Sequence, residues 1–447
     1  MLQLVGNQGP ICVAKISARL KCLPLQITTR ITRAARTTSF LLRAAIAFAV
    51  CTRVREARAD EPAERPTKTE FTPAPLIGGN SDIGFGGGAI LSFARVLPGS
   101  DDPLPYVYRL EFATTTTVKS EGGSIKVPYQ DEYLLLSMPH LLRNKIQLDV
   151  RVSFTAESTQ KYYGIGNAVF VPPDRSLDDP IYEYGRVHVA ASIDGTVHIT
   201  RPLSLLLWVA YVHNWLDVPP GTVLAEDVAH GDSTVRSLLT PFEPHGVVTF
   251  TYGVDFDTRD SKVSATRGMH HATRVDLSPG GTPGIPQRWG RWNTNLRAYL
   301  PIGTDGSTIA LRFVSDLLFG SPPFYELARY DDTGVFGGPN GVRGVPDGRY
   351  SGMIKLFGSV ELRKMLFDFR FLDKRNTLGV VAFADSGRAF TSYDSHPELD
   401  GTSLGLKLGL GAGARLLAGK SFVLRADVAW SPDARPVGVY VAAGQTF

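Results

Sequence analysis

Apolar and polar side chains alternate with a period of two along most of the chain after residue 80. In residues 146–156 the apolar side chains fall on even numbers, and the polar ones, from Gln147 to Thr155, fall on odd numbers. Residues 403–416 repeat the pattern, with Leu or Ala on even numbers and Gly, Ser, Lys or Arg on odd numbers. A segment with this period has one apolar and one polar face. The pattern predicts amphipathic β-strands.

We find fifteen such runs. Because single-chain bacterial barrels have an even number of strands, we expect about sixteen strands in all, with the remaining one hidden in 218–245 or near 66–77. The fifteen runs lie near 82–96, 105–118, 127–138, 146–156, 180–194, 196–212, 246–257, 266–278, 290–300, 306–317, 351–365, 377–390, 403–416, 421–430 and 436–447.

These runs predict an all-β protein that forms a single transmembrane antiparallel β-barrel. Many of them span about ten residues or more, whereas strands of soluble sandwiches commonly have about 5–6. Closure is required in a lipid solvent, because an open sheet edge would leave backbone groups unpaired in hydrocarbon. Tight turns such as 301–306 and 417–420, and long connections such as 213–245 and 318–350, fit the two unlike rims of an outer-membrane barrel. A soluble sandwich or propeller is the alternative.

The first 59 residues differ from the rest and read as a targeting leader. An apolar stretch, 39–50, follows a basic flank, and Ala57-Arg58-Ala59 resembles a small-x-small cleavage site. We expect an export signal over 1–59, a disordered, Pro-rich tether over 60–78 and the barrel over 79–447. The expected location is therefore the bacterial outer membrane. A transit peptide is the second interpretation of the leader, and it would place the barrel in an organelle outer envelope.

The leader also accounts for the charge and the cysteines of the whole sequence. It holds ten basic side chains and one acidic one, so the other 388 residues have 37 basic and 42 acidic side chains and a net charge of −5. A nucleic-acid partner is therefore not expected. All three cysteines, Cys12, Cys22 and Cys51, lie in the leader, which leaves no disulfide and no thiolate metal site in the barrel. We expect no metal and no cofactor.

Catalytic motifs do not stand out from the sequence. His270 and His271 are neighbours on a predicted strand, so they point to opposite faces and do not share one metal ion. No Gly-x-Ser-x-Gly motif occurs. We therefore expect that the protein is not an enzyme, and a barrel hydrolase assembled from distant strands is the less favoured alternative.

Several strings in the barrel region resemble one family. Residues 338–345 read Gly-Pro-Asn-Gly-Val-Arg-Gly-Val and resemble the Val-Arg-Gly-Phe/Tyr loop of the BamA/TamA-type assembly barrels, also called bacterial surface antigens. Val345 departs from the aromatic residue of that motif. Five further strings fit the family in the expected order, and these are 76–88, 163–167, 257–260 with 267–268, 358–363 and 383–387. The resemblance implies a sixteen-stranded barrel whose long loop folds into the lumen, and a role in protein insertion or translocation. A passive pore or a surface antigen without a protein client is the alternative.

The resemblance also indicates how the loop is held. The alternation places Glu361 and Asp385 on the lumen face of neighbouring strands, where a loop arginine would find two carboxylates for charge-assisted hydrogen bonds. Unpaired lumen charges are the alternative. Carried over residue by residue, the family's loop–lumen lock falls on Arg343, Gly344, Glu361, Phe383, Asp385 and Gly387.

Two further expectations concern partners. Family members that assemble proteins carry periplasmic POTRA domains, and no helical period precedes the barrel here. Either a separate periplasmic protein supplies their role, or this barrel has a different function. Phe447, in an apolar strand, resembles the terminal aromatic that the barrel-assembly machinery uses during membrane insertion. We also expect a weak seam between the Gly-rich strand near 82–96 and the strand near 436–447, since glycine packs little and loses much entropy on folding.

Overall fold

The computed structural model describes residues 67–97, 106–121, 123–280, 288–303, 306–330, 334–371, 374–419 and 422–447. The leader, 1–59, and the first part of the predicted tether lie outside these residues. The strands in the described part are β1 (Lys68–Asn80), β2 (Gly84–Val96), β3 (Tyr106–Glu121), β4 (Ser124–Lys126), β5 (Tyr129–His140), β6 (Ile146–Lys161), β7 (Glu183–His198), β8 (Leu203–Asp217), β9 (His245–Asp257), β10 (Gly268–Ser278), β11 (Trp289–Ile302), β12 (Ser307–Gly320), β13 (Ile354–Phe371), β14 (Lys374–Phe390), β15 (Lys407–Ala418), β16 (Phe422–Ser431) and β17 (Ala434–Ala443).

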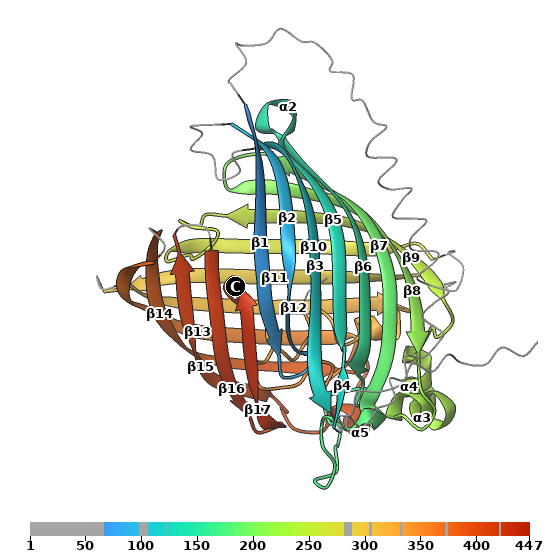
Figure 1. The fold of residues 1–447 in the computed structure, drawn as a ribbon. Helices are drawn as coiled ribbons and strands as arrows, with labels where there is room; N and C mark the ends of the chain where they lie inside the picture. The colour runs from blue at the N-terminus through green and yellow to red at the C-terminus, as the bar shows by residue number, and fades with distance from the viewer. Residues whose placement is uncertain are drawn as a thin grey trace, which may run out of the picture. The chain divides into compact units, whose positions relative to one another are not determined.

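Sixteen of these strands form one closed antiparallel barrel, and the short β4 only extends the end of β3 (Figure 1). Each barrel strand pairs with the next along the chain, with β3 pairing directly with β5, and β1 pairs with β17 to close the ring. The helices are short and lie between strands. They are α2 (Leu141–Asn144), α3 (Val223–His230), α4 (Ser233–Leu238), α5 (Pro397–Asp400) and the 3₁₀ turns η1 (Pro180–Tyr182) and η2 (Phe324–Glu326). None of the helices in the described residues has the length and apolarity needed to cross a membrane.

Each of the fifteen sequence runs corresponds to a barrel strand, and the sixteenth strand corrects the predicted tether. Strand β1 occupies residues 68–80. This confirms one of the two positions expected for the missing strand, near 66–77, and corrects the prediction that 60–78 is a disordered tether. Pro73 and Pro75 hid it, because proline is rare inside a sheet. They are tolerated here because β1 pairs with β2 along its whole length but with β17 only near Asn80, so most of its other edge has no strand partner. The alternative position for the missing strand, 218–245, contains α3 and α4.

The two ends of the barrel differ in the length of their connections. Short connections at one end include 199–202 and 303–306, whereas the other end has the longer 162–182, 218–244 and 321–353. This asymmetry agrees with the sequence prediction. The ends of β1 and β17 at which the described chain begins and finishes lie on the short-turn side, because an even number of antiparallel strands brings the chain back to its starting rim.

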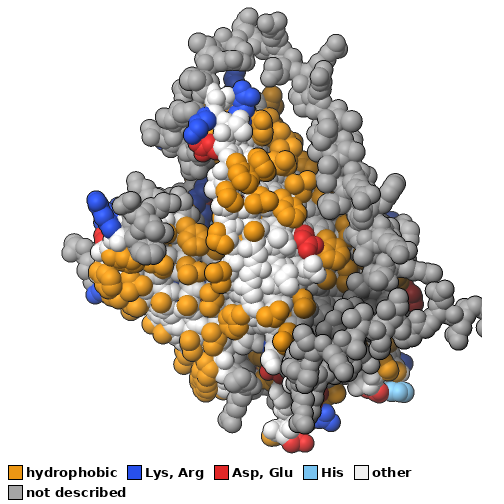
Figure 2. Space-filling model, viewed as in Figure 1, with side chains coloured by type: hydrophobic (Ala, Val, Ile, Leu, Met, Phe, Trp, Pro, Cys, Tyr) orange, Lys and Arg blue, Asp and Glu red, His pale blue; other side chains and the backbone are white. Residues whose placement is uncertain are grey.

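Apolar side chains cover the outside of the barrel and polar ones line the inside. On β13, Val360 and Leu362 are about half exposed on the outer face, whereas Glu361 and Arg363 between them are buried in the lumen. The leucines from Leu404 to Leu410 likewise face outward and are 45–71% exposed. Figure 2 shows this apolar surface running over successive strands. An outer surface of this kind fits a lipid environment, while the polar interior fits water.

The barrel closes through a short seam. Strand β1 pairs with β17 at only two positions, Gly79↔Val441 and Asn80↔Tyr440, whereas its pairing with β2 covers thirteen. In Figure 1 the blue β1 and the red β17 lie next to each other at this point. The predicted seam partner near 82–96 was wrong, because that run is β2 and lies one strand further in. The seam is nevertheless held by few backbone pairs, because β1 and β17 pair at two positions.

Candidate functional site

The longest described connection, 321–353 between β12 and β13, packs inside the barrel. Its apolar residues form a buried cluster with residues from the inner wall, which includes Phe357 of β13. Val345, which departs from the aromatic of the family motif, is completely buried in this cluster. A valine therefore makes the packing contact that the sequence left in doubt. The loop members of the cluster are Tyr330, Phe336, Val342, Val345 and Tyr350.

Arg343, in this loop, is surrounded by the carboxylates that the strand alternation placed in the lumen. Its Nε donates to Asp385 Oδ2 at 2.7 Å, and its Nη2 donates to Asp385 Oδ1 at 2.9 Å. Its Nη1 donates to Glu361 Oε1 at 2.7 Å. The side chains of all three residues are fully shielded from solvent. This two-pronged contact with Asp385 is the geometry that makes arginine–carboxylate pairs strong and directional.

The remaining residues of the predicted set lie around this ion pair. The Phe383 ring lies under the guanidinium, with its centroid 3.4 Å from Arg343 Cζ, an arrangement that permits a cation–π contact. Gly344 has φ +92°, in the left-handed region that favours glycine. Gly387 leaves room for the Phe336 ring, because a Cβ atom there would lie 2.8 Å from two ring carbons. The structure thus brings all six residues of the set into one place.

The cluster is larger than the sequence indicated. Asp427 of β16 lies 3.6 Å from Arg343 Nη1 and also pairs with Arg415 of β15. Arg363 pairs with Glu361 through Nη2 at 2.7 Å, and Arg425 is buried beside the same groups. The alternation already placed these four residues on lumen faces. Which of their side chains form ion pairs across the lumen depends on how the strands close into a barrel, and the local sequence does not show this.

Loop residues also contact β17 and the β1–β2 turn beside the seam. The Gly344 N–H donates to Tyr440 Oη of β17 at 2.8 Å. On the other side, the Asp347 N–H donates a longer hydrogen bond, 3.4 Å, to Asp82 Oδ2 in the turn between β1 and β2. The adjacent Ser81 N–H donates to the Val439 carbonyl of β17 at 3.1 Å. The loop therefore lies against the place where the barrel closes.

Phe447 is not in the position that the sequence predicted. Strand β17 ends at Ala443, and Phe447 lies beyond it with its side chain turned into the lumen, 6% exposed, against Ala265, Tyr299 and Ala310. Its carbonyl oxygen accepts from Arg363 Nη2 at 2.9 Å. The expectation that residue 447 belongs to an apolar strand was wrong, because the chain turns inward at Gly444, where φ is +88°.

The other candidates from the sequence have structural partners. His270 Nε2 lies 2.7 Å from Asp255 Oδ1, while His271 stacks near Phe256 on the other face. Asp257 binds its neighbour Arg259 through two hydrogen bonds. Within the described ranges, no group of three or more His, Cys, Asp or Glu side chains is arranged to hold a metal ion.

The comparison with protein families decides what this barrel is. Residues 127–447 match the Omp85 superfamily domain. The chain belongs to the Omp85 superfamily. The match covers the strands from β5 onward, the buried loop and the Arg343 cluster, whereas β1 and the β1–β2 turn of the seam lie before it.

Solved structures with the same fold include a BamA barrel and a CdiB barrel. The BamA structure from Haemophilus ducreyi lacking POTRA domains 1–3 aligns with a TM-score of 0.56 at 13% identity, over 84% of this chain and 70% of that one. CdiB from Escherichia coli aligns with a TM-score of 0.52 at 13% identity, over 86% of this chain and 68% of that one. At this identity the likeness shows the fold alone. No curated protein matches the sequence.

Proposed function

We propose that this Omp85 barrel resides in the bacterial outer membrane and helps to insert or translocate polypeptides, using the β1–β17 seam as the place where a client strand engages. The seam is the observation that carries the proposal. Two paired positions hold it, so most of the β1 edge keeps backbone N–H and C=O groups available to an added strand. Edge pairing of this kind is a general way to bind an extended polypeptide.

In this proposal the lumen loop determines whether the seam is closed or open. Arg343 anchors the loop to β13 and β14, and the neighbouring Gly344 and Asp347 contact β17 and the β1–β2 turn. Holding the loop in the lumen thereby favours the closed seam, and releasing it would remove contacts from both sides. The six predicted residues therefore act, in this proposal, as a lock on the seam and not as a catalytic centre.

A separate periplasmic protein would deliver clients to the short-turn rim, in the role that POTRA domains have in other members. The barrel offers that rim the turns 258–267 and 199–202 and the segment 444–447. Co-purification of the detergent-solubilised barrel from native membranes, followed by cross-linking through a cysteine at Arg201, tests this part of the proposal. A cross-linked periplasmic protein is expected, and recovery of the barrel alone would contradict it.

The client role is tested by locking the seam. In a background with Cys12, Cys22 and Cys51 changed to Ser, Ser81→Cys with Val439→Cys joins the two sides of the seam, whose backbones are hydrogen-bonded there. The matched control is Val428→Cys with Val439→Cys, which joins β16 to β17 at paired positions. The assay is the folding rate of a small unfolded β-barrel client in vesicles that contain the protein, followed by heat-modifiable gel mobility.

We expect the oxidised seam pair to reduce client folding to the rate of empty vesicles and reduction to restore it, while the oxidised control pair stays active. Equal activity of the oxidised seam pair and the control would contradict the proposal. A passive pore is the competing function, and it predicts steady single-channel conductance that Arg343→Ala leaves unchanged, together with no acceleration of client folding by any variant.

A further inference from the structure

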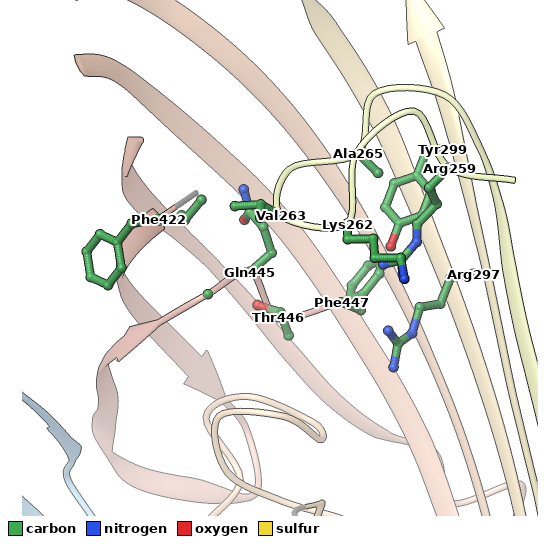
Figure 3. A pocket seen from close by; sticks show the side chains of 12 residues that line it. Arg259, Lys262, Val263, Ala265, Arg297, Tyr299, Phe422, Gln445, Thr446 and Phe447 are labelled. Carbon is green, nitrogen blue, oxygen red and sulfur yellow. The ribbon is translucent and has the colours of Figure 1, made fainter. Parts of the chain in front are cut away.

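A cavity lies inside the barrel at the short-turn rim. Its volume is about 350 Å³, and it is enclosed by the turn between β9 and β10, by β11 and by residues 444–447 (Figure 3). Neither Asp nor Glu is present among the described residues that line it. The polar side chains on its walls are Arg259, Lys262, Arg297, Tyr299, Gln445 and Thr446.

Two of the three cations on the walls have no acidic partner in the part of the chain that the structure describes. Arg259 is neutralised by Asp257, which accepts from its Nε and Nη2 at 2.9 and 2.7 Å. Arg297, by contrast, has two polar contacts within the described residues, the Asn295 amide oxygen at 3.2 Å and the His270 ring at 3.4 Å. Lys262 is exposed and forms no ion pair with another described residue. The described side chains that line the cavity are therefore basic in excess, with no acidic one among them.

The Tyr299 hydroxyl supplies an independent sign that a ligand belongs here. Tyr299 is 2% exposed, and Figure 3 shows its oxygen directed into the cavity. No hydrogen bond of acceptable geometry reaches this hydroxyl from the described part of the chain, although the guanidinium of Arg259 is close to it. Buried polar groups in folded proteins nearly always have a partner, so a donor aimed into a cationic cavity indicates an absent acceptor.

Two further arginines, Arg312 and Arg363, lie against Phe447, which lines the cavity. Arg312 has Tyr330, Phe357 and Phe447 rings within cation–π range but no carboxylate partner among the described residues. Arg363 uses two nitrogens on Glu361 and Phe447, and its third, Nη1, is buried without a partner in the described part of the barrel. The field inside this end of the lumen thus favours an anion over a neutral molecule.

We propose that this cavity binds a phosphate group, carried by a free phosphate ester or by a lipid headgroup. A phosphate offers several acceptor oxygens in a tetrahedral arrangement, which suits cationic and hydroxyl donors that converge from Lys262, Arg297 and Tyr299. Arginine adds a planar fork of N–H donors that matches phosphate oxygens. The site goes beyond the proposed role at the seam, because none of these three residues belongs to the Arg343 lock.

Isothermal titration of the full chain in detergent tests the site, with glycerol 3-phosphate as the soluble probe and dihexanoyl phosphatidic acid as the lipid probe. We expect saturable binding with one site per chain. Lys262→Gln and Tyr299→Phe should each weaken it, Lys262→Gln by roughly tenfold for the loss of one charge-assisted hydrogen bond. Tyr299→Phe keeps the packing and removes a hydroxyl that accepts or donates no well-formed hydrogen bond within the described residues, so it should fold normally.

Lys145→Gln is the matched control, because Lys145 is an exposed lysine on the same rim and outside the cavity. It should leave the affinity unchanged. Tighter binding of glycerol 3-phosphate would identify a free ester as the natural ligand, and tighter binding of the lipid would identify a headgroup. The proposal is overturned if neither probe binds saturably, or if Lys262→Gln and Tyr299→Phe bind as tightly as Lys145→Gln.

Discussion

The backbone N–H of Gly344 donates a 2.8 Å hydrogen bond to the hydroxyl of Tyr440, and this contact joins the lumen loop to the last strand of the barrel. Gly344 directly follows Arg343, whose side chain is fixed to Glu361 and Asp385 on the opposite side of the loop backbone. The residue that anchors the loop, Arg343, and the residue that contacts the seam strand β17, Gly344, are therefore neighbours in the sequence. Several consequences of this closeness are measurable.

Tyr440→Phe removes the acceptor and leaves the buried Gly344 N–H unpaired. We predict a loss of about 1–3 kcal/mol in the free energy of unfolding, because an unsatisfied buried donor carries its full desolvation cost. Urea unfolding followed by tryptophan fluorescence measures it. Tyr211→Phe is the control, since Tyr211 lies on the outer face and is 45% exposed. Equal stability of the two variants would show that the loop contact contributes nothing.

Arg343→Ala should be far more damaging, because it leaves Glu361 and Asp385 buried near one another without their shared cation. Removing one partner of a buried ion pair commonly lowers the free energy of unfolding by about 3–5 kcal/mol. We expect Arg343→Lys to rescue this only partly, since an ammonium lacks the fork that reaches both Asp385 oxygens. Arg370→Ala, at an exposed position, should be neutral. Unfolding midpoints in urea compare the four proteins, and full rescue by lysine would argue against the fork geometry.

Phe447→Ala distinguishes a packing role from a purely targeting one. The ring fills a buried space against Tyr299 and Ala310, so we expect about 3–5 kcal/mol of destabilisation, as for other buried Phe→Ala changes. The control is Phe313→Ala, on the outer face at 45% exposed. If purified and folded Phe447→Ala is as stable as Phe313→Ala and only its yield in membranes falls, the residue acts during insertion and not in the finished barrel.

The contact between Asp82 and Asp347 predicts a pH dependence on the β1 side of the seam. Burial raises the pKa of Asp82 to about 6, against the favourable charge of Lys119, and burial beside Asp82 also raises the pKa of Asp347. Both groups bind protons more tightly in the folded protein than in the unfolded chain. Stability from the two protonated, buried carboxyl groups is therefore complete below about pH 4 and falls as the pH rises toward 6 through ionisation of Asp82, although the Asp347 N–H partly offsets this by favouring the charged carboxylate.

The prediction is that hydrogen exchange of residues 81–83 and 347–348 speeds up between pH 4 and pH 7 beyond the intrinsic change, and that Asp82→Asn abolishes this extra acceleration. Asp174→Asn serves as the control, because Asp174 is exposed and is not among the charges that shift the pKa of Asp82. An identical pH profile in Asp82→Asn and in the unaltered protein would contradict it.

Alternation along the chain predicted fifteen of the sixteen barrel strands, because each strand of such a barrel has one face toward lipid and the other toward water. It also placed Glu361 and Asp385 in the lumen. The pattern failed at β1, where prolines occupy an edge that has little pairing, and at Phe447, where a turn at Gly444 redirects the chain. Contacts across the lumen, such as Arg343 with Asp427, depend on barrel closure and leave no local signal.

The central claim is that the loop anchored by Arg343 stabilises the closed seam. Hydrogen exchange of the β17 amides in Arg343→Ala, compared with the unaltered protein under folded conditions, tests it most directly. We predict that exchange accelerates in residues 437–443 and in 76–80 of β1, while the β7–β8 pair, with its fourteen paired positions, remains protected. Faster exchange in the loop with no change at the seam would contradict the account.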